Sequence, residues 1–161
     1  MFTIVVVLNT SAFSAFKQIN CFEILKELFD QQIAIPRGVL EEYSRRFVAK
    51  PSFITVKDLT QKQMERARNL DLGQGEKEAI ILAQDLEALL IIEDRKARKI
   101  CEEMGIEKTG TYGIIRVAFE ECIITRQQMI EMVEKLKKHL YYRKSLIDWV
   151  LAAQKSQKVR E

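Results

Sequence analysis

Continuous apolar runs and amphipathic stretches alternate along most of the chain. The run from Ile4 to Leu8 is rich in β-branched residues and does not alternate with polar positions, and Leu89 to Ile92 has the same character. Such runs are typical of strands that are buried on both faces of a parallel sheet. The segment from Gln32 to Ile35 predicts a further strand. The segment from Phe53 to Val56 fits either a short edge strand or an ordered connection, and the pattern leaves both open.

Between these runs the apolar positions recur with helical spacing. Helices are predicted after Asn9-Thr10-Ser11, over Cys21–Phe29, from Pro36 to about Arg46, from Thr60 to about Asn69, from Glu76 to about Leu86, over Arg95–Met104 and from about Thr111, with a short strand ending at Thr109. Thr60–Gln63 has the spacing of a capping box, Pro36 suits the first turn of a helix, and Gly105 suits a helix end. This βα succession predicts an α/β domain with a mainly parallel sheet that is covered on both faces.

Two further helices are expected to close the chain. Thr125–Gln128 and Ser145–Asp148 both resemble capping boxes that would open them. Their apolar stripes are Met129, Met132, Val133, Leu136 and Leu140 in the first helix, and Leu146, Trp149, Val150 and Ala153 in the second. A stripe of this kind is typical of core or of a dimer interface rather than of a functional aromatic site. We expect one domain over residues 1–155 and a polar tail at 156–161.

Composition narrows the class of protein. The 161 residues are 47% hydrophobic, which is enough to build a core without metal or disulfide staples. The three cysteines are widely spaced without a C-x-x-C pair, which disfavours a zinc ribbon or a redox dithiol and favours reduced, packed thiols. The run from Phe2 to Leu8 is too short to span a membrane and lacks signal-peptide features, so a cytosolic protein without membrane attachment is predicted. A net charge of +3 permits contact with a phosphate backbone.

Acidic and amide side chains stand where the predicted elements meet. Asn9 follows the first strand and Glu93-Asp94 follows Ile92, and open parallel sheets bind ligands beyond such strand ends. Asp94 would equally well cap the helix that begins at Arg95. Glu78 lies early in a helix, where an acid also complements the helix dipole. Glu42, beside Glu41, has the composition of a surface acid. Taken singly, these residues do not identify a site.

The order of the features is more informative. The chain contains, in this order, a strand with Asn-Thr-Ser, Ile-Pro-x-x-Val-Leu-Glu-Glu, Leu-Gly-x-Gly-Glu-x-Glu-Ala-Ile, Leu-Ile-Ile-Glu-Asp-Arg-Lys-Ala-Arg and Thr-Gly-Thr-x-Gly. Over nearly its whole length it resembles the PIN domain family, in particular the single-domain prokaryotic VapC-like predicted nucleases. The most specific parts are residues 73–80, 94–98 and 109–113. The resemblance implies a three-layer α/β/α domain with a mainly parallel central sheet, which binds Mg²⁺ or Mn²⁺ in an acidic pocket and cleaves RNA.

The resemblance also implies roles for individual residues. The catalytic acids would be Glu42, Glu78 and Asp94; Asn9 would join them around the metal, Glu76 and Glu93 are possible substitutes, and Thr10, Ser11 and Thr111 are candidate supporting residues. Thr10 or Ser11 would hold the first acid in place, whereas Thr111 would orient a carboxylate or phosphate, or cap the following helix. The family normally has Asp where this chain has Asn9. The amide oxygen still suits a hard cation, but one negative charge is missing, so metal affinity and water activation are expected to fall.

Alternatives concern the surface and the partners. Basic residues could line an RNA path or form a solvated helix face: Arg95, Lys96, Arg98 and Lys99, with Arg45, Arg46 and Lys50. His139 is the only histidine and is expected at the surface, which leaves a histidine-based site without partners. The resemblance further implies a homodimeric toxin that is neutralised by an antitoxin protein. The alternative to a ribonuclease is a non-catalytic PIN-like module that binds RNA or a protein.

Overall fold

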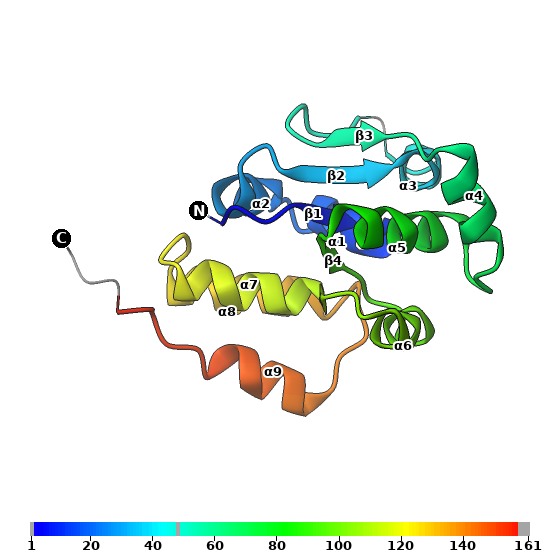
Figure 1. The fold of residues 1–161 in the computed structure, drawn as a ribbon. Helices are drawn as coiled ribbons and strands as arrows, with labels where there is room; N and C mark the ends of the chain where they lie inside the picture. The colour runs from blue at the N-terminus through cyan, green and yellow to red at the C-terminus, as the bar shows by residue number, and fades with distance from the viewer. Residues whose placement is uncertain (1, 48, 158–161) are drawn as a thin grey trace.

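A five-stranded parallel sheet forms the centre of the molecule in the computed structural model, which describes residues 2–47 and 49–157 (Figure 1). Its order is β3-β2-β1-β4-β5, and all four strand pairings are parallel. The strands are β1 (Val6–Leu8), β2 (Ile33–Pro36), β3 (Thr55–Lys57), β4 (Leu89–Ile91) and β5 (Lys108–Thr109). The prediction of a mainly parallel sheet is therefore confirmed, and the segment left open becomes an edge strand, β3.

Helices cover both faces of this sheet. They are α1 (Thr10–Gln18), α2 (Phe22–Phe29), α3 (Arg37–Ser44), α4 (Gln61–Arg68), α5 (Gln74–Leu86), α6 (Arg95–Met104), α7 (Thr111–Glu120), α8 (Arg126–Leu136) and α9 (Lys144–Leu151). Helix α5 packs on β1, β2 and β4, with α4 and α6 against it. Helices α1 and α2 contact α7 and lie on the opposite face of the sheet (Figure 1). The result is a three-layer α/β/α architecture to which α8 and α9 are added against α7 (Figure 1).

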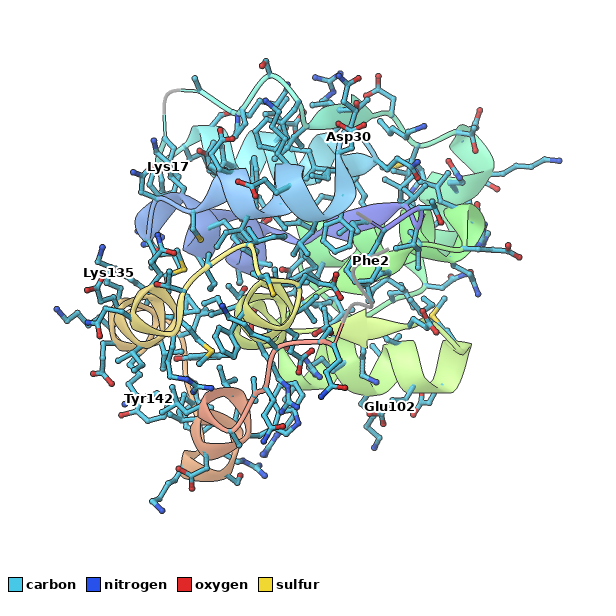
Figure 2. The ribbon with its side chains drawn as sticks, turned by 90° about the vertical axis from the view of Figure 1, so that its left-hand side faces the viewer. Phe2, Lys17, Asp30, Glu102, Lys135 and Tyr142 are labelled. Atoms are coloured by element: carbon cyan, nitrogen blue, oxygen red, sulfur yellow. The ribbon has the colours of Figure 1, made fainter. Side chains whose placement is uncertain are left out.

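The central strands are buried because their side chains are apolar on both faces. Val6, Val7 and Leu8 are all completely buried, and Leu8 lies opposite Ile91 in the parallel register. Charged side chains such as Lys17, Asp30, Glu102 and Lys135 instead lie at the outside of the molecule (Figure 2). No helix among the described residues is both long enough and apolar enough to cross a membrane.

Most helix ends follow the predicted signals, but Pro36 ends β2 and is the N-cap of α3 instead of lying in the first turn of that helix. Thr60 and Thr125 form the expected capping boxes with Gln63 and Gln128. The predicted capping box at Ser145–Asp148 is wrong, because the N-cap of α9 is Arg143, two residues before Ser145, and it makes no side-chain cap. Helix α5 also begins earlier than predicted, at Gln74 rather than Glu76.

Two further details differ from the sequence expectations. Trp149 is 48% exposed, so it does not belong to the buried stripe of α9, where Ile147 takes its place beside Val150. Its ring packs under the guanidinium group of Arg116 at 4.2 Å. Cys21 and Cys101 are buried free thiols as predicted, whereas Cys122 is exposed. Of the predicted polar tail, residues 158–161 lie outside the described residues.

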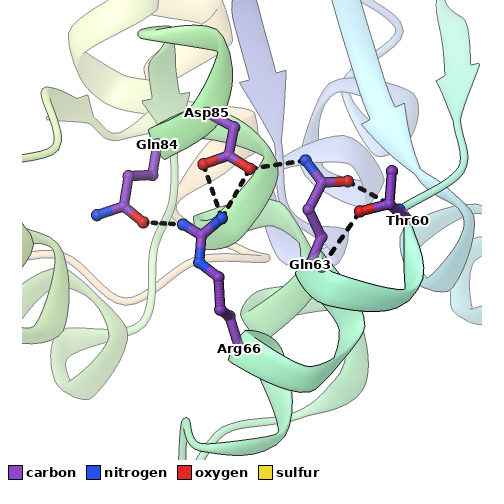
Figure 3. Close-up of polar contacts among 5 residues, drawn as sticks. All are labelled: Thr60, Gln63, Arg66, Gln84 and Asp85. Carbon is purple, nitrogen blue, oxygen red and sulfur yellow. Dashed lines mark hydrogen bonds and ion pairs between the residues drawn. The ribbon is translucent and has the colours of Figure 1, made fainter.

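An exposed polar network fastens α4 to α5 at the edge of one helical layer (Figure 3). The Arg66 guanidinium group donates to both carboxylate oxygens of Asp85, at 2.8 and 2.7 Å, and to the side-chain amide of Gln84. Gln63 donates to the same carboxylate at 2.7 Å while its amide oxygen accepts from Thr60. These contacts hold the C-terminal end of α5 against the helix before it.

Candidate functional site

The chain order of the strands reverses between β1 and β4, and the candidate residues lie at their carboxyl ends. β1 lies between β2 and β4, so the connections on its two sides run in opposite directions. In sheets of this kind the ends of such strands frame the ligand-binding crevice. The backbone amide of Asn9 donates to the carbonyl of Ile91 at 3.2 Å, which brings Asn9 next to the segment that continues into Glu93 and Asp94.

Asn9 is completely buried at the start of α1. Its Oδ1 accepts a hydrogen bond from the backbone amide of Ala12 at 3.0 Å, which makes it the N-cap of the helix. Its Nδ2 is buried and has no hydrogen-bond partner among the described residues. A carbonyl oxygen has two lone pairs, so Oδ1 retains one that a cation could share. Asn9 therefore combines a capping role with an unpaired amide nitrogen inside the site.

Two glutamates join α3 and α5 reciprocally. Glu42 on α3 accepts a hydrogen bond from the backbone amide of Gly75, at the start of α5, at 2.8 Å. Glu78 on α5 accepts one from the backbone amide of Gly38, at the start of α3, at 3.2 Å. Free amides of a first helical turn point along the axis and favour negative charge, so each carboxylate satisfies the other helix. We call Glu42, Gly75, Glu78 and Gly38 the reciprocal clasp.

Neither glycine of the clasp leaves room for a side chain. A Cβ on Gly75 would lie 2.5 Å from Thr10 Oγ1 and 2.8 Å from Glu42 Oε2, and a Cβ on Gly38 would collide with the Glu78 carboxylate. Thr10 donates to Glu42 Oε2 at 2.5 Å, so the supporting hydroxyl group is in contact with one of the predicted acids. Ser11, the other candidate, is exposed.

Glu93 serves a third helix start. Its Oε1 accepts from both the backbone amide and the hydroxyl group of Thr111, at 2.6 and 2.5 Å. A Cβ on Gly110 would lie 3.2 Å from Glu93 Oε2 and 3.4 Å from a terminal nitrogen of Arg98. Thr111 thus orients a carboxylate, one of the roles predicted for it, and it does so with the substitute acid.

Glu76 and Asp94 are the two remaining candidate acids, and among the described residues neither accepts a hydrogen bond from the first turn of another helix in the way that Glu42, Glu78 and Glu93 do. Asp94 stands at the N-cap position of α6, but its side chain makes no capping hydrogen bond, so the capping interpretation of this residue is wrong. Glu76, in the first turn of α5, has a pKa raised by burial and by the negative charges of Asp94 and Glu42, against the lowering effect of the Gly73 amide and Lys96. Like charges that approach one another in this way are stabilised by a cation.

The donor set fits a hard divalent ion. Carboxylates of Glu42, Glu76 and Asp94 with the amide oxygen of Asn9 offer only oxygen ligands, which Mg²⁺ and Mn²⁺ prefer. The repulsion that raises the pKa of Glu76 is what such an ion would relieve. Within residues 2–47 and 49–157, no three His, Cys, Asp or Glu side chains are grouped closely enough to hold a metal ion as they stand.

The predicted RNA-contacting cations of α6 have separate partners. Lys96 forms an ion pair with the exposed Asp71 at 2.6 Å. Arg98 donates to the carbonyl of Ile92 at 3.1 Å, at the end of the β4 segment, while Arg95 is exposed. Arg98 is therefore half-buried beside Glu93 and Gly110 rather than free in solvent.

A family model described as a PIN domain, DUF3368, matches residues 5–156, which is almost the whole chain. The chain belongs to the PIN domain family. No curated protein matches it. The PIN domain match confirms the family and agrees with the α/β/α fold and its parallel sheet. PIN domains are generally dependent on divalent metal ions and are nuclease-type folds, which agrees with the oxygen-rich donor set at the carboxyl ends of β1 and β4.

Sequence reasoning did not identify two residues of this PIN site. Gly38 and Gln74 hold Glu78, the first through its backbone amide and the second by donating to Oε2 at 2.5 Å. A signal was present in each case, because Gly38 precedes Glu42 by four residues and Gln74 precedes Glu78 by four, which places each pair on one helix face. The three-dimensional crossing of α3 and α5 decides which carboxylate meets which amide.

Proposed function

We propose that this PIN domain is a divalent-metal-dependent endoribonuclease. The observation that carries the proposal is the electrostatic coupling of Glu76 with Asp94 and Glu42 beside the buried Asn9, at the carboxyl ends of the central strands. Carboxylates whose charges repel one another in a PIN fold are suited to hold a cation against a phosphodiester group. Asp94 and Glu42 remain in this proposal from the sequence prediction, and Glu76, the predicted substitute, joins them.

The chain's own residues have distinct parts in the proposed reaction. Glu42, Glu76, Asp94 and the Oδ1 of Asn9 would hold the ion, which when bound lowers the pKa of a coordinated water and offsets charge on the phosphate. Thr10 and Gly75 fix the carboxylate of Glu42 from two sides, so its orientation does not depend on the ion. Arg98, tied to the Ile92 carbonyl, supplies positive charge beside Glu93 where a phosphate could lie.

Glu78 is a predicted catalytic acid whose side chain is buried and hydrogen-bonded within the fold. It is only 4% exposed and accepts from Gly38 and Gln74. A hollow of about 330 Å³ opens beside it, lined in part by Arg37, Glu41 and Asp58. Its catalytic role stays a prediction, and a variant at this position separates that role from the clasp.

The direct test compares wild type, Asn9→Asp and Asp94→Asn for Mn²⁺-dependent cleavage of a mixed RNA pool. Glu103→Gln, which changes an exposed acid on the helix that follows Asp94, is the matched control. We expect cleavage by wild type, faster cleavage by Asn9→Asp, and loss of about 100-fold or more in Asp94→Asn, in line with removal of a charge-stabilising group. Equal cleavage by all four chains would refute the site.

A narrower form of the proposal, a homodimeric toxin with an antitoxin partner, is supported by the resemblance to VapC-like proteins alone. A short open reading frame beside the gene, whose product binds the chain and blocks cleavage, would support it. A monomer in sedimentation experiments without such a neighbour would contradict it. The alternative, a non-catalytic module, is favoured by Asn9 in place of Asp and predicts RNA binding with no cleavage in either wild type or Asn9→Asp.

A further inference from the structure

The connection between α8 and α9 concentrates positive charge and exposed aromatic rings. Residues 135–144 contain five Lys and Arg side chains and no Asp or Glu, although the net charge of the whole chain is only +3. The remainder of the chain is therefore net negative, and this segment carries the positive excess. We name residues 135–144 the basic-aromatic turn. It contains Lys135, Lys137, Lys138, His139, Tyr141, Tyr142, Arg143 and Lys144.

Most of these side chains are available to a ligand. Tyr141 is 82% exposed and Tyr142 is 40% exposed, and both belong to the few large apolar side chains at the surface of the described residues. Figure 2 shows Lys135 and Tyr142 toward the same side of the molecule, near α8 and α9. Two members are engaged: Lys137 forms an ion pair with Glu134 at 2.8 Å, with its ammonium group 5.3 Å from the Tyr142 ring, and Lys144 forms an ion pair with Asp148 at 3.3 Å. Within the described part of the chain, Lys138 and Arg143 form no salt bridge.

The turn is held in place rather than loosely attached. The backbone amides of His139 and Leu140 both donate to the carbonyl of Leu136 at 2.9 Å, which continues the end of α8. Leu140 packs against the core, and its carbonyl accepts from the hydroxyl group of Tyr112 at 3.5 Å. An open hollow of about 450 Å³ lies along residues 137–142.

The hydrogen bond between Tyr112 and Leu140 joins the basic-aromatic turn to the acidic site. Tyr112 is buried in the first turn of α7, directly after Thr111, whose amide and hydroxyl groups bind Glu93. Burial, with the nearby charge of Glu93 and the phenol of Tyr142 as further causes, raises the pKa of Tyr112 to about 12. Tyr112 therefore lies near Glu93 and contacts the basic-aromatic turn. Figure 1 shows the α8–α9 connection at the end of the molecule where α6 and α7 begin, which is the end that holds the acids.

We propose that the basic-aromatic turn is the surface that binds single-stranded RNA and leads it to the acidic site. Cations such as Lys138 and Arg143 would neutralise phosphates, and the exposed ring of Tyr141 would stack on an unpaired base. An exposed aromatic ring can stack only on a base that is not already inside a duplex, which selects a single strand. This inference rests on the proposed function, because it assigns the substrate-holding surface of that same site.

Binding is tested separately from cleavage. The protein is titrated, in EDTA, into a fluorescein-labelled single-stranded RNA of about 12 nucleotides, and binding is followed by fluorescence anisotropy between about 50 and 200 mM salt. The variants are Lys138→Ala/Arg143→Ala for charge and Tyr141→Ala with Tyr141→Phe for stacking. The matched control is Lys62→Ala/Arg68→Ala, which removes one exposed Lys and one exposed Arg from α4.

The two variants should differ in their salt dependence. We expect Lys138→Ala/Arg143→Ala to weaken binding at least 5-fold and to reduce the slope of log K against log salt by about 1.4, or about 0.7 for each lost phosphate contact. Tyr141→Ala should weaken binding at least 5-fold with an unchanged slope, and Tyr141→Phe should retain affinity because a phenyl ring also stacks. A duplex of the same length should bind more weakly than the single strand.

Several results would overturn the inference. These are wild-type affinity in both turn variants, an equal loss in the α4 control, equal binding of duplex and single strand, or a sedimentation shift showing that the turn joins two copies of the chain. Cleavage assays in Mn²⁺ keep the two proposals apart. If the turn variants bind RNA normally while Asp94→Asn abolishes cleavage, the inference fails and the proposed function stands. If binding depends on the turn but Mn²⁺ supports no cleavage, the proposed function fails.

Discussion

At the residue scale, Asn9 is the position where a buried polar side-chain atom lacks a hydrogen-bond partner among the described residues. Its Nδ2 is buried without a partner, and an unsatisfied buried donor costs about 1–3 kcal/mol. An aspartate would replace that donor with a second carboxylate oxygen and add a charge beside Glu42, Glu76 and Asp94. Asn9 thus lowers the repulsion among these acids at the expense of affinity for a cation.

The substitution Asn9→Asp should therefore exchange stability for metal binding. Without metal we expect a lower melting temperature, since a fourth charge joins the acids, and with Mn²⁺ we expect affinity to rise about 10-fold or more. Calorimetric titration and thermal melts in EDTA and in Mn²⁺ measure both effects. Asn69→Asp, at an exposed position after α4, is the control and should change neither. Equal Mn²⁺ affinity in wild type and Asn9→Asp would show that position 9 is not part of a metal site.

Glu76 predicts a pH dependence of stability. Its pKa is raised in the folded chain, so the folded state binds the proton more tightly than the unfolded state does. Stability is fully present below the unfolded pKa and is lost as the pH rises through the folded pKa. At neutral pH and without metal, Glu76→Gln should raise Tm by about 1–3 °C and flatten the decline in stability with pH above about 4.3, the ordinary glutamate pKa. Melts in EDTA across this pH range would show no difference if Glu76 were unstrained.

A variant of Glu78 separates a structural role of this side chain from a catalytic one. Glu78→Gln keeps the shape and one acceptor oxygen but replaces a charge that accepts from Gly38 and Gln74, so we expect a loss of about 1–3 kcal/mol in unfolding free energy. If the clasp is its whole role, Mn²⁺-dependent cleavage per folded molecule stays within a few-fold of wild type. A loss of cleavage comparable to that of Asp94→Asn would show that Glu78 is also a catalytic residue.

At the scale of elements, helix starts explain why so many acids lie at one edge. Glu42, Glu78 and Glu93 each accept from the first turn of a helix other than their own, at α5, α3 and α7. This arrangement fixes three helices at the carboxyl ends of the strands. The same acids that a sequence pattern assigns to a metal also hold the helices together.

Gly75→Ala should break this arrangement locally. The new Cβ would lie 2.5 Å from Thr10 Oγ1 and 2.8 Å from Glu42 Oε2, so either the threonine hydroxyl group or the carboxylate must move. We expect a loss of about 1–3 kcal/mol, as for other overpacked sites, although alanine has the better helix propensity. Urea unfolding measures this loss of unfolding free energy. Gly73→Ala, where a Cβ would meet nothing closer than 4.0 Å, is the control for steric overlap and should show only the cost of an alanine at the N-cap of α5.

The sequence predicts elements better than it predicts contacts. Uninterrupted apolar runs identify β1 and β4, and the capping boxes at Thr60 and Thr125 identify the starts of α4 and α8, because these signals are local. The predicted start of α9 was wrong, because Ser145 has the sequence spacing of a cap but the helix begins at Lys144 without a side-chain cap. The partner of Glu78 could not be predicted because the contact is not local: Gly38 meets Glu78 only after α3 and α5 cross.

At the scale of the whole molecule, charge is divided between two regions. The acids lie at the ends of the central strands, where burial and mutual repulsion act together, and the positive excess lies in the basic-aromatic turn beyond Tyr112. Unlike an even distribution, this division allows a cation and a polyanion to bind side by side, since each meets charge of the opposite sign. The parallel topology makes it possible by bringing β1 and β4 together from distant parts of the chain.

Metal binding should accordingly be visible in the stability of the entire fold. An ion that binds only the folded chain stabilises it by about 2.7 kcal/mol at 100 times Kd, which for a chain of this size corresponds to a rise in Tm of about 5–10 °C. Thermal melts at increasing Mn²⁺ should show this rise in wild type and in Glu103→Gln, and much less of it in Asp94→Asn. Because α3, α5 and α7 all start at the acidic edge, an ion there would restrain three helices at once. A rise that is equal in all three chains would instead indicate weak binding spread over surface carboxylates and would remove Asp94 from the site.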